Sequence, residues 1–409
     1  MAGTLRIVRN HAGIGQQNRM AIFRVLSAEG PMPRTDLAER VGLTDASVSR
    51  ITRDLIRTGF LEETTAPPPT GKPGRPGINL QIRGDGGFVV GIGINAYEQS
   101  AVLWNLSHRK LAQCALGQMG MVSHEADCDR IAQRVETMLA DAGVDRRRVL
   151  GIGVACAGAV DPHAGVVTAS ATINWFDIPV AAMLSARLEL PCGVEGTTNA
   201  ILTAECQAGR IPRNKDALGL TAALGFGGGM LFNGQLLRGR NFRAGQISQI
   251  AVTGRADADG RAMTLDEIGA GRGILARLGE PMSPHPGGPY DPAFAAGRLL
   301  DVIARARAGD PRLKAAFAET GYECGRILSP VVTALSPDVI LVGGPVSQVP
   351  DYAAAIGRAI TELGPTEDGP EIVLTGMSNA DAGAHHAVGV HFLNHGFETV
   401  ELTAFERSA

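Results

Sequence analysis

Side chains able to bind nucleic acid are concentrated in one short stretch near the N-terminus. Thr44, Ser47 and Ser49 supply hydroxyl groups, and two arginines, Arg50 and Arg53, follow them at helical spacing. Hydroxyl and guanidinium groups are donors that reach phosphate oxygens and base edges in a DNA groove. We therefore expect these residues to lie on the outward face of a recognition helix.

Two short amphipathic helices joined by a tight turn are expected to position these groups. Leu37 and Ala38 fall on the apolar face of the first helix, and Val48 and Ile51 fall on that of the second. Gly42 stands between them, where a sharp turn favours a residue without a Cβ atom. This is the spacing of a helix-turn-helix motif. An ordinary helical hairpin with a solvated charged face is the alternative.

The flanking sequence extends this motif to a winged helix. Residues 17–29 carry apolar side chains at helical spacing and would form the first helix of a three-helix core. Residues 64–80 form a Pro/Gly-rich tip between strands, and its Gly74-Arg75-Pro76 element would suit a narrow minor groove; a flexible linker is the alternative. The residues expected to contact DNA are Arg34, Thr44, Ser47, Ser49, Arg50, Arg53, Lys72 and Arg75.

The composition agrees with a multidomain protein that binds DNA through its N-terminal part. The chain has 409 residues, enough for two or three domains. Residues 1–80 hold 11 Lys and Arg against 7 Asp and Glu, a net charge of +4, whereas residues 81–409 hold 27 against 34, a net charge of -7. The basic part can therefore meet DNA phosphates. Six scattered cysteines without a Cys-x-x-Cys pair suit a reducing cytoplasm, and no apolar run indicates a signal peptide or membrane partner.

From Gly87 the chain alternates between strand and helix patterns. Residues 88–113 predict a three-stranded antiparallel meander, and residues 218–241 repeat it with Gly-rich and Asn-Gly turns. This duplication predicts a two-lobed α/β fold with a cleft between the lobes. The expected domains are a winged helix-turn-helix over residues 1–82, a first lobe over 83–205 completed by a C-terminal helix at about 381–409, and a larger second lobe over 206–380.

A series of short motifs follows the winged helix in a specific order, although each motif alone is a weak signal. They are Gly91-Ile92-Gly93-Ile94, GAVD at 158–161, Asn174-Trp175, Val194-Glu195, Asn199-Ala200, Gly227-Gly228-Gly229, Asn233-Gly234, Gly245 and Gly343-Gly344. In this order the chain resembles, over nearly its whole length, the repressor, open-reading-frame and kinase (ROK) family. The resemblance implies a winged helix fused to a sugar-kinase-like domain of the actin and hexokinase ATPase fold.

The chain departs from the kinase pattern of that family at two positions. In the kinases of the family, an Asp positions magnesium and a Gly-Gly-Thr turn binds the nucleotide phosphates. The resemblance places the Asp at Gly93 and the turn at Asn95-Ala96-Tyr97. It places the catalytic Asp, which takes a proton from a sugar hydroxyl, at Thr197. A threonine hydroxyl is no general base near neutral pH. We therefore expect no kinase activity, no catalytic residue and no cofactor.

The resemblance also implies that the structural zinc site of many family members is missing. Its His and Cys ligands correspond to residues within 246–249 and 257–264, which contain neither imidazole nor thiolate. A hard-cation site on Asp257 and Asp259 is the alternative to a solvated loop.

The positions that match the family's sugar contacts remain mostly polar. Amides and hydroxyls can bind a polyol, although ordinary satisfied loop residues would give the same pattern. The expected effector-binding residues are Thr172, Asn174, Thr197, Gln246, Gln249 and Asp266.

Together these features predict a cytoplasmic DNA-binding transcription regulator, a repressor of carbohydrate-related genes with a catalytically inactive sugar-kinase-like domain. Its expected partners are an inverted-repeat operator in double-stranded DNA, a small neutral sugar or polyol, and further copies of itself in a homodimer or dimer of dimers. The alternatives are a ROK carbohydrate kinase and a regulator controlled by a protein partner without a small ligand.

Overall fold

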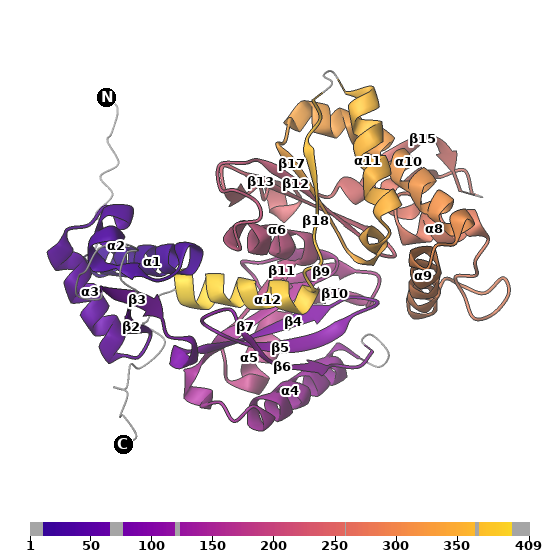
Figure 1. The fold of residues 1–409 in the computed structure, drawn as a ribbon. Coiled ribbons are helices and arrows are strands. Elements are labelled where there is room, and N and C mark those ends of the chain that lie inside the picture. The colour runs from indigo at the N-terminus through magenta and orange to yellow at the C-terminus, as the bar shows by residue number, and fades with distance from the viewer. Residues whose placement is uncertain (1–10, 66–76, 119–122, 258, 365–367, 395–409) are drawn as a thin grey trace, which may run out of the picture.

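A small N-terminal helical unit is followed by two α/β lobes, and the last helix of the chain returns to lie against both the first lobe and the N-terminal unit (Figure 1). The computed structural model describes residues 11–65, 77–118, 123–257, 259–364 and 368–394. All structural statements below refer to these residues.

The N-terminal unit is the predicted winged helix. Its three helices are α1 (His11–Glu29), α2 (Arg34–Val41) and α3 (Asp45–Arg57), and its sheet has the order β1-β3-β2 (Met32–Pro33, Ile78–Ile82, Leu61–Thr65). Gly42 ends α2 in the left-handed region, at φ 67°, as the tight turn requires. Thr44 caps α3 by accepting a hydrogen bond from the Ser47 backbone N–H at 3.3 Å.

The first lobe is built on a five-stranded sheet. Its strand order is β11-β7-β4-β5-β6: Cys192–Gly196, Val149–Cys156, Phe88–Ile94, Gln99–Asn105 and Lys110–Ala115. Helices α4 (His124–Asp141) and α5 (Val180–Leu188) pack on one face of the sheet. The predicted meander is confirmed as β4-β5-β6. A small sheet of β8 (Ala159–Asp161), β9 (Val166–Ser170) and β10 (Trp175–Ile178) was not predicted, because its strands are short and partly polar.

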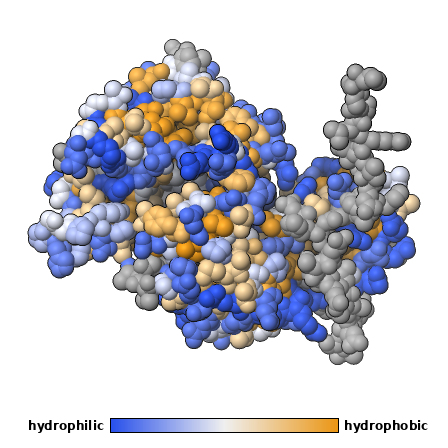
Figure 2. Space-filling model, turned by 180° about the vertical axis from the view of Figure 1, so that it is seen from behind, coloured by the Kyte–Doolittle hydropathy of each residue, from blue (hydrophilic) through white to orange (hydrophobic). Residues whose placement is uncertain are grey.

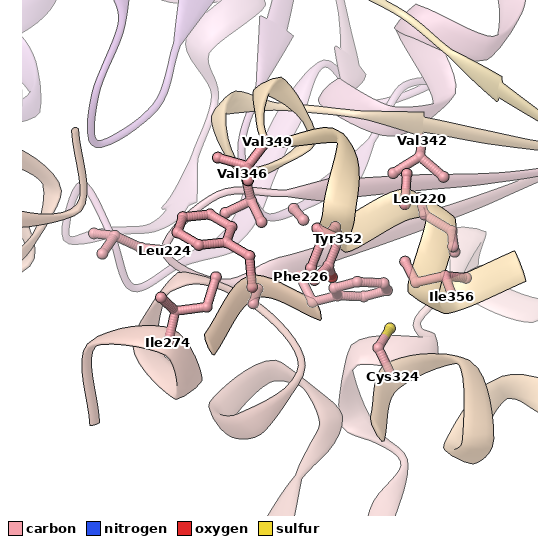
Figure 3. Packing of buried hydrophobic residues seen from close by; sticks show 14 of the residues in the cluster. Leu220, Leu224, Phe226, Ile274, Cys324, Val342, Val346, Val349, Tyr352 and Ile356 are labelled. Atoms are coloured by element: carbon pink, nitrogen blue, oxygen red, sulfur yellow. The ribbon is translucent and has the colours of Figure 1, made fainter. Parts of the chain in front are cut away.

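The second lobe repeats the arrangement. Its sheet has the order β14-β13-β12-β17-β18: Gln235–Leu236, Phe226–Phe232, Ala217–Ala222, Val339–Gly343 and Glu371–Leu374. The helices on its outer side are α8 (Gly271–Leu278), α9 (Pro292–Arg307), α10 (Pro311–Leu335) and α11 (Pro350–Leu363). Figure 3 shows side chains from β12, β13, β17, α8, α10 and α11 converging on one buried cluster. A hairpin, β15 (Ala251–Ala256) and β16 (Ala262–Thr264), leads into α7 (Leu265–Ile268).

Two helices form a middle layer between the sheets: α6 (Thr197–Gln207) and α12 (Asn379–Ala387). The α6 helix packs on the second sheet, where Leu202 contacts Gly219 and Gly229. The expected boundary between the lobes, at residues 205 and 206, falls inside this helix. The division into lobes therefore stays a proposal, with α6 shared between them.

The α12 helix lies directly on a strip of glycines in the first sheet. A Cβ atom on Gly91 or Gly93 of β4 would overlap the backbone of α12 near Ala380, and one on Gly153 of β7 would overlap the Gly383 carbonyl oxygen. Only residues without a side chain permit so close an approach of helix and sheet.

The C-terminal continuation of α12 reaches the core of the winged helix. A π-helical segment, Val388–Asn394, extends α12, and its Phe392 ring packs against Phe23 of α1 and Phe60, with ring centroids 4.5 and 5.6 Å apart. In Figure 1 this is the yellow helix that runs from the middle of the molecule toward α1 and α3. The winged helix thus shares one apolar cluster with α12 and β5.

A polar and aromatic contact joins the winged helix to the first lobe at a second point. His108, in the turn between β5 and β6, stacks on His385 of α12 with ring centroids 5.1 Å apart, and its Nε2 lies 3.0 Å from the Ser27 Oγ of α1. Burial lowers the pKa of His385 to about 3, so this imidazole is neutral at physiological pH.

The glycine strip gives a test of this packing. Gly153→Ala should lower the free energy of unfolding by about 1–3 kcal/mol, the usual cost of overpacking, because α12 must move off the sheet. Gly297→Ala, at an exposed position in α9 with no atom near the new methyl group, should instead stabilise the protein by about 1 kcal/mol. Melting temperatures of the two variants check this. Equal stability of Gly153→Ala and the wild type would contradict the packing of α12.

Candidate effector cavity and DNA-contact surface

The outer face of α3 carries the polar groups expected to contact DNA. Arg50 and Arg53 are exposed, and neither has an ion-pair partner within the described ranges. Thr44 is exposed at the start of the helix, and its hydroxyl also donates to the Ser47 Oγ at 3.0 Å. Ser49 is half-buried. The structure therefore gathers these five residues on one helix, with two guanidinium groups available to a ligand.

Arg34 has a different environment. Its guanidinium is 2.6 Å from the Glu63 carboxylate of β2 and donates to the Thr52 hydroxyl of α3 at 3.3 Å. These contacts fix α2 against the wing strand and α3, which gives Arg34 a positioning role inside the domain. Lys72 and Arg75 lie outside the described residues.

A large cavity lies between the two lobes. Its volume is about 920 Å³, near the upper end of the range for small-molecule sites. In the space-filling view the molecule is hollowed between its upper and lower lobes (Figure 2). Five of the six residues expected to bind an effector line this cavity: Thr172, Thr197, Gln246, Gln249 and Asp266.

The sixth expected residue, Asn174, does not line the cavity. It is exposed in the turn between β9 and β10, at φ 54°. Asp266 lines the cavity, but both of its carboxylate oxygens have partners. One accepts the backbone N–H of Phe226 at 2.7 Å, and the other pairs with the Arg272 guanidinium. Asp266 therefore holds the turn between β12 and β13 in place.

Several lining residues carry buried polar atoms without a hydrogen-bond partner in the described part of the chain. They are Thr197 Oγ1, Asn199 Oδ1 and Asn95 Nδ2. The side chain of a further lining residue, Asn379, interacts with the Tyr97 hydroxyl. Buried polar atoms are normally hydrogen-bonded, and these atoms are almost completely covered although their residues line the cavity. The three asparagines were not expected among the site residues. Asn95, as a polar residue in place of a glycine, and Asn199, in the Asn199-Ala200 motif, did give a signal.

Two aromatic side chains at the cavity were also missed. Phe176 of β10 is 54% exposed, although large apolar side chains are usually covered. Phe242, which also lines the cavity, has a positive φ of 57°, which is costly for a bulky residue and is found mainly where function requires it. Aromatic faces of this kind can pack against the apolar face of a sugar ring.

The charges that line the cavity are balanced. The buried carboxylate of Glu195 is paired with Arg238 at 2.8 Å, and Asp266 is paired with Arg272. Asp177 and Arg243 contribute one exposed charge of each sign. A neutral ligand fits this wall better than a strongly charged one.

The turn between β4 and β5 is tightly packed where the resemblance places the magnesium and phosphate sites of the kinases. Any side chain on Gly93 would collide with Asn379 and Ala380 at the start of α12. Asn95 Oδ1 accepts the backbone N–H groups of Tyr97 and Glu98 at 2.8 and 2.6 Å. These amides are therefore already satisfied by the turn itself and are closed to a phosphate.

No cluster of three or more His, Cys, Asp or Glu side chains is arranged to hold a metal ion within the described ranges. The loop with Asp257 and Asp259, the alternative cation site, is held together by hydrogen bonds and an ion pair within the turn. Asp257 accepts the backbone N–H groups of Asp259 and Arg261 and pairs with the Arg261 guanidinium at 2.9 Å. Its carboxylate thus stabilises the turn. Among the described helices, none is both long and apolar enough to cross a bilayer.

Comparisons with known proteins agree with this architecture. A xylose repressor from Caldicellulosiruptor bescii is 21% identical over 83% of this chain and 85% of its own length. The Escherichia coli DNA-binding transcriptional dual regulator NagC is 24% identical over 82% of each chain. The crystal structure of a ROK family transcriptional regulator, a homologue of E. coli MLC protein, matches with a TM-score of 0.71 over 91% of this chain and 96% of its own. Sugar kinases are also among the relatives.

Two family models match the chain. Residues 18–65 match the IclR helix-turn-helix domain, in agreement with the observed winged helix. Residues 98–388 match the ROK family, which covers well over half of the chain. The expected fold, a winged helix-turn-helix joined to a two-lobed sugar-kinase-like domain, is confirmed, and the chain belongs to the ROK family.

Proposed function

We propose that this protein is a cytoplasmic DNA-binding transcription regulator, a repressor of carbohydrate-related genes, whose sugar-kinase-like domain binds an effector and has no kinase activity. The observation that carries the proposal is the position of α12. The helix begins where a kinase would need its magnesium carboxylate, and its continuation ends in the core of the winged helix.

The outer face of α3 supports the DNA-binding role. Arg50 and Arg53 are exposed and have no ion-pair partner in the described chain, and the N-terminal region is basic. Relatives named as a xylose repressor and a DNA-binding regulator also support the DNA-binding role. One winged helix buries too little surface for high specificity, so a homodimer or dimer of dimers on an inverted repeat is part of the proposal.

The closed β4–β5 turn supports the absence of kinase activity. Phosphoryl transfer needs metal-held phosphates and a positioned base. Here Gly93 leaves no space for a carboxylate, and Thr197 offers only a hydroxyl. The kinases among the relatives make a ROK carbohydrate kinase the competing function.

The DNA-binding role predicts that Arg50→Ala weakens operator binding by about 1–3 kcal/mol, since the variant loses a base or phosphate contact while the fold is kept. Fluorescence anisotropy with a DNA fragment selected from a random library by the wild-type protein measures this. Arg147→Ala, an equally exposed arginine in the first lobe, is the control and should bind like the wild type. Unchanged affinity of Arg50→Ala would contradict the assignment of the recognition helix.

The proposed lack of kinase activity and of zinc ligands predicts that the purified protein transfers no phosphate from ATP to hexoses or N-acetylhexosamines and contains no zinc. The double variant Gly93→Asp and Thr197→Asp should stay inactive, because α12 occupies the space that the first carboxylate needs. A coupled assay run beside an active ROK glucokinase and elemental analysis check both points. Turnover by the wild type, or stoichiometric zinc, would favour the kinase alternative.

A further inference from the structure

Several of the polar groups expected to contact DNA are engaged inside the winged helix. The Thr44 hydroxyl accepts the backbone N–H of Ser47 at 3.3 Å and donates to the Ser47 Oγ at 3.0 Å, so it caps α3. Arg34 is held by the wing strand, and the Arg57 guanidinium lies 3.6 Å from the Asp54 carboxylate. These contacts narrow the set of described side chains that are available to read a DNA sequence.

An exposed stripe on α3 carries groups that stay available. Ala46, Arg50 and Arg53 are exposed and are spaced by four and three residues, so they point in the same direction from the helix. Val48 and Leu55 are buried on the opposite side, in the core of the winged helix. The stripe therefore faces outward, where a major groove can receive it.

The charge along this face orients the helix in the groove. Asp45, exposed at the first position of α3, would repel a phosphate, whereas Arg53, two turns later, would attract one. The start of the helix thus favours the base edges, where a carboxylate can accept a hydrogen bond from cytosine N4. Its later turns favour the phosphate backbone.

Ala46 adds an apolar group at the start of the stripe. A methyl group makes no hydrogen bond, and its apolar counterpart in the major groove is the C5-methyl group of thymine. Arg50 follows one turn later, and an arginine can bind guanine O6 and N7 with two hydrogen bonds. Four residues of an α-helix advance by about 6 Å, slightly less than two base-pair steps of roughly 3.4 Å each.

From this arrangement we infer that Ala46 is a specificity-determining residue for the operator half-site. Its methyl group packs on a thymine methyl about two base pairs from a guanine that Arg50 binds, and Arg53 binds a phosphate. The inference rests on the proposed DNA-binding function, and it adds the bases that the recognition helix reads.

Small chemical changes in the DNA test the inference with the full-length protein. The operator is a fragment selected from a random library by the wild-type protein, and each thymine of one half-site is replaced in turn by uracil, which lacks only the methyl group. Fluorescence anisotropy should show an affinity loss of about fourfold at one thymine, the effect of one buried methyl group. Replacing the guanine about two base pairs away by 7-deazaguanine, which lacks the N7 acceptor, should also weaken binding.

Protein variants assign the two effects to side chains. Ala46→Gly should bind the thymine and uracil fragments equally, whereas Ala354→Gly, at an exposed position of α11 in the second lobe, should keep the difference. The ratio of two affinities within one variant does not depend on any loss of helix stability. Arg50→Ala should lose the effect of 7-deazaguanine. Arg53→Ala should weaken all fragments alike and reduce the salt dependence of log Kd by about one ion.

Melting temperatures establish that the variants are folded. The inference is overturned if no thymine-to-uracil change weakens binding, if Ala46→Gly keeps the difference between the two fragments, or if the effect of 7-deazaguanine survives in Arg50→Ala. A selection that yields no specific fragment would contradict the proposed function as well. Specific binding that is indifferent to the thymine methyl group would overturn the inference and leave that function intact.

Discussion

The arrangement of most of this molecule depends on the direct contact between α12 and the glycine strip of the first sheet. Glycines at 91, 93 and 153 let the helix backbone touch β4 and β7, so α12 is buried between the two sheets. Its small residues Ala380 and Ala384 lie against the strands. Interiors at this density tolerate little displacement, and α12 is therefore fixed relative to the first lobe.

This position links the cavity to the DNA-binding domain. Asn379, the first residue of α12, lines the cavity, and Phe392, beyond its last turn, packs on the winged helix. The His108 contact to Ser27 adds a second attachment. In the proposed regulator, a ligand that moves α12 and the first lobe against the second lobe would thus move the winged helix with them. Such a ligand acts only through its differential affinity for the two arrangements.

The same position supports the proposal that the kinase reaction of the family is absent here. A carboxylate on β4 would need the space that α12 fills, and the phosphate-binding amides of the turn are satisfied by Asn95. The packing of α12 on the first sheet and the proposed lack of kinase activity therefore involve the same residues of β4.

Much of the fold could be predicted from the sequence, because it follows from local patterns. The helix-turn-helix spacing around Gly42 and the duplicated meanders are periodic signals of this kind. The candidate site was harder to predict from the sequence, because the cavity brings together segments that are distant in the chain. No local pattern reveals that Asn379 and Asn95 line the same cavity, that Phe176 is exposed, or that Arg34 is held by Glu63.

The most direct test of this account is the coupling between the cavity and the DNA. Operator affinity should be measured with and without the saccharide that the protein binds most tightly in calorimetric titrations, in the wild type and in Phe392→Ala, which cuts the contact between α12 and the winged helix. We expect the saccharide to change wild-type affinity by about 1–3 kcal/mol, and to bind Phe392→Ala equally well with most of this coupling lost. Undiminished coupling in Phe392→Ala, or none in the wild type, would contradict the account.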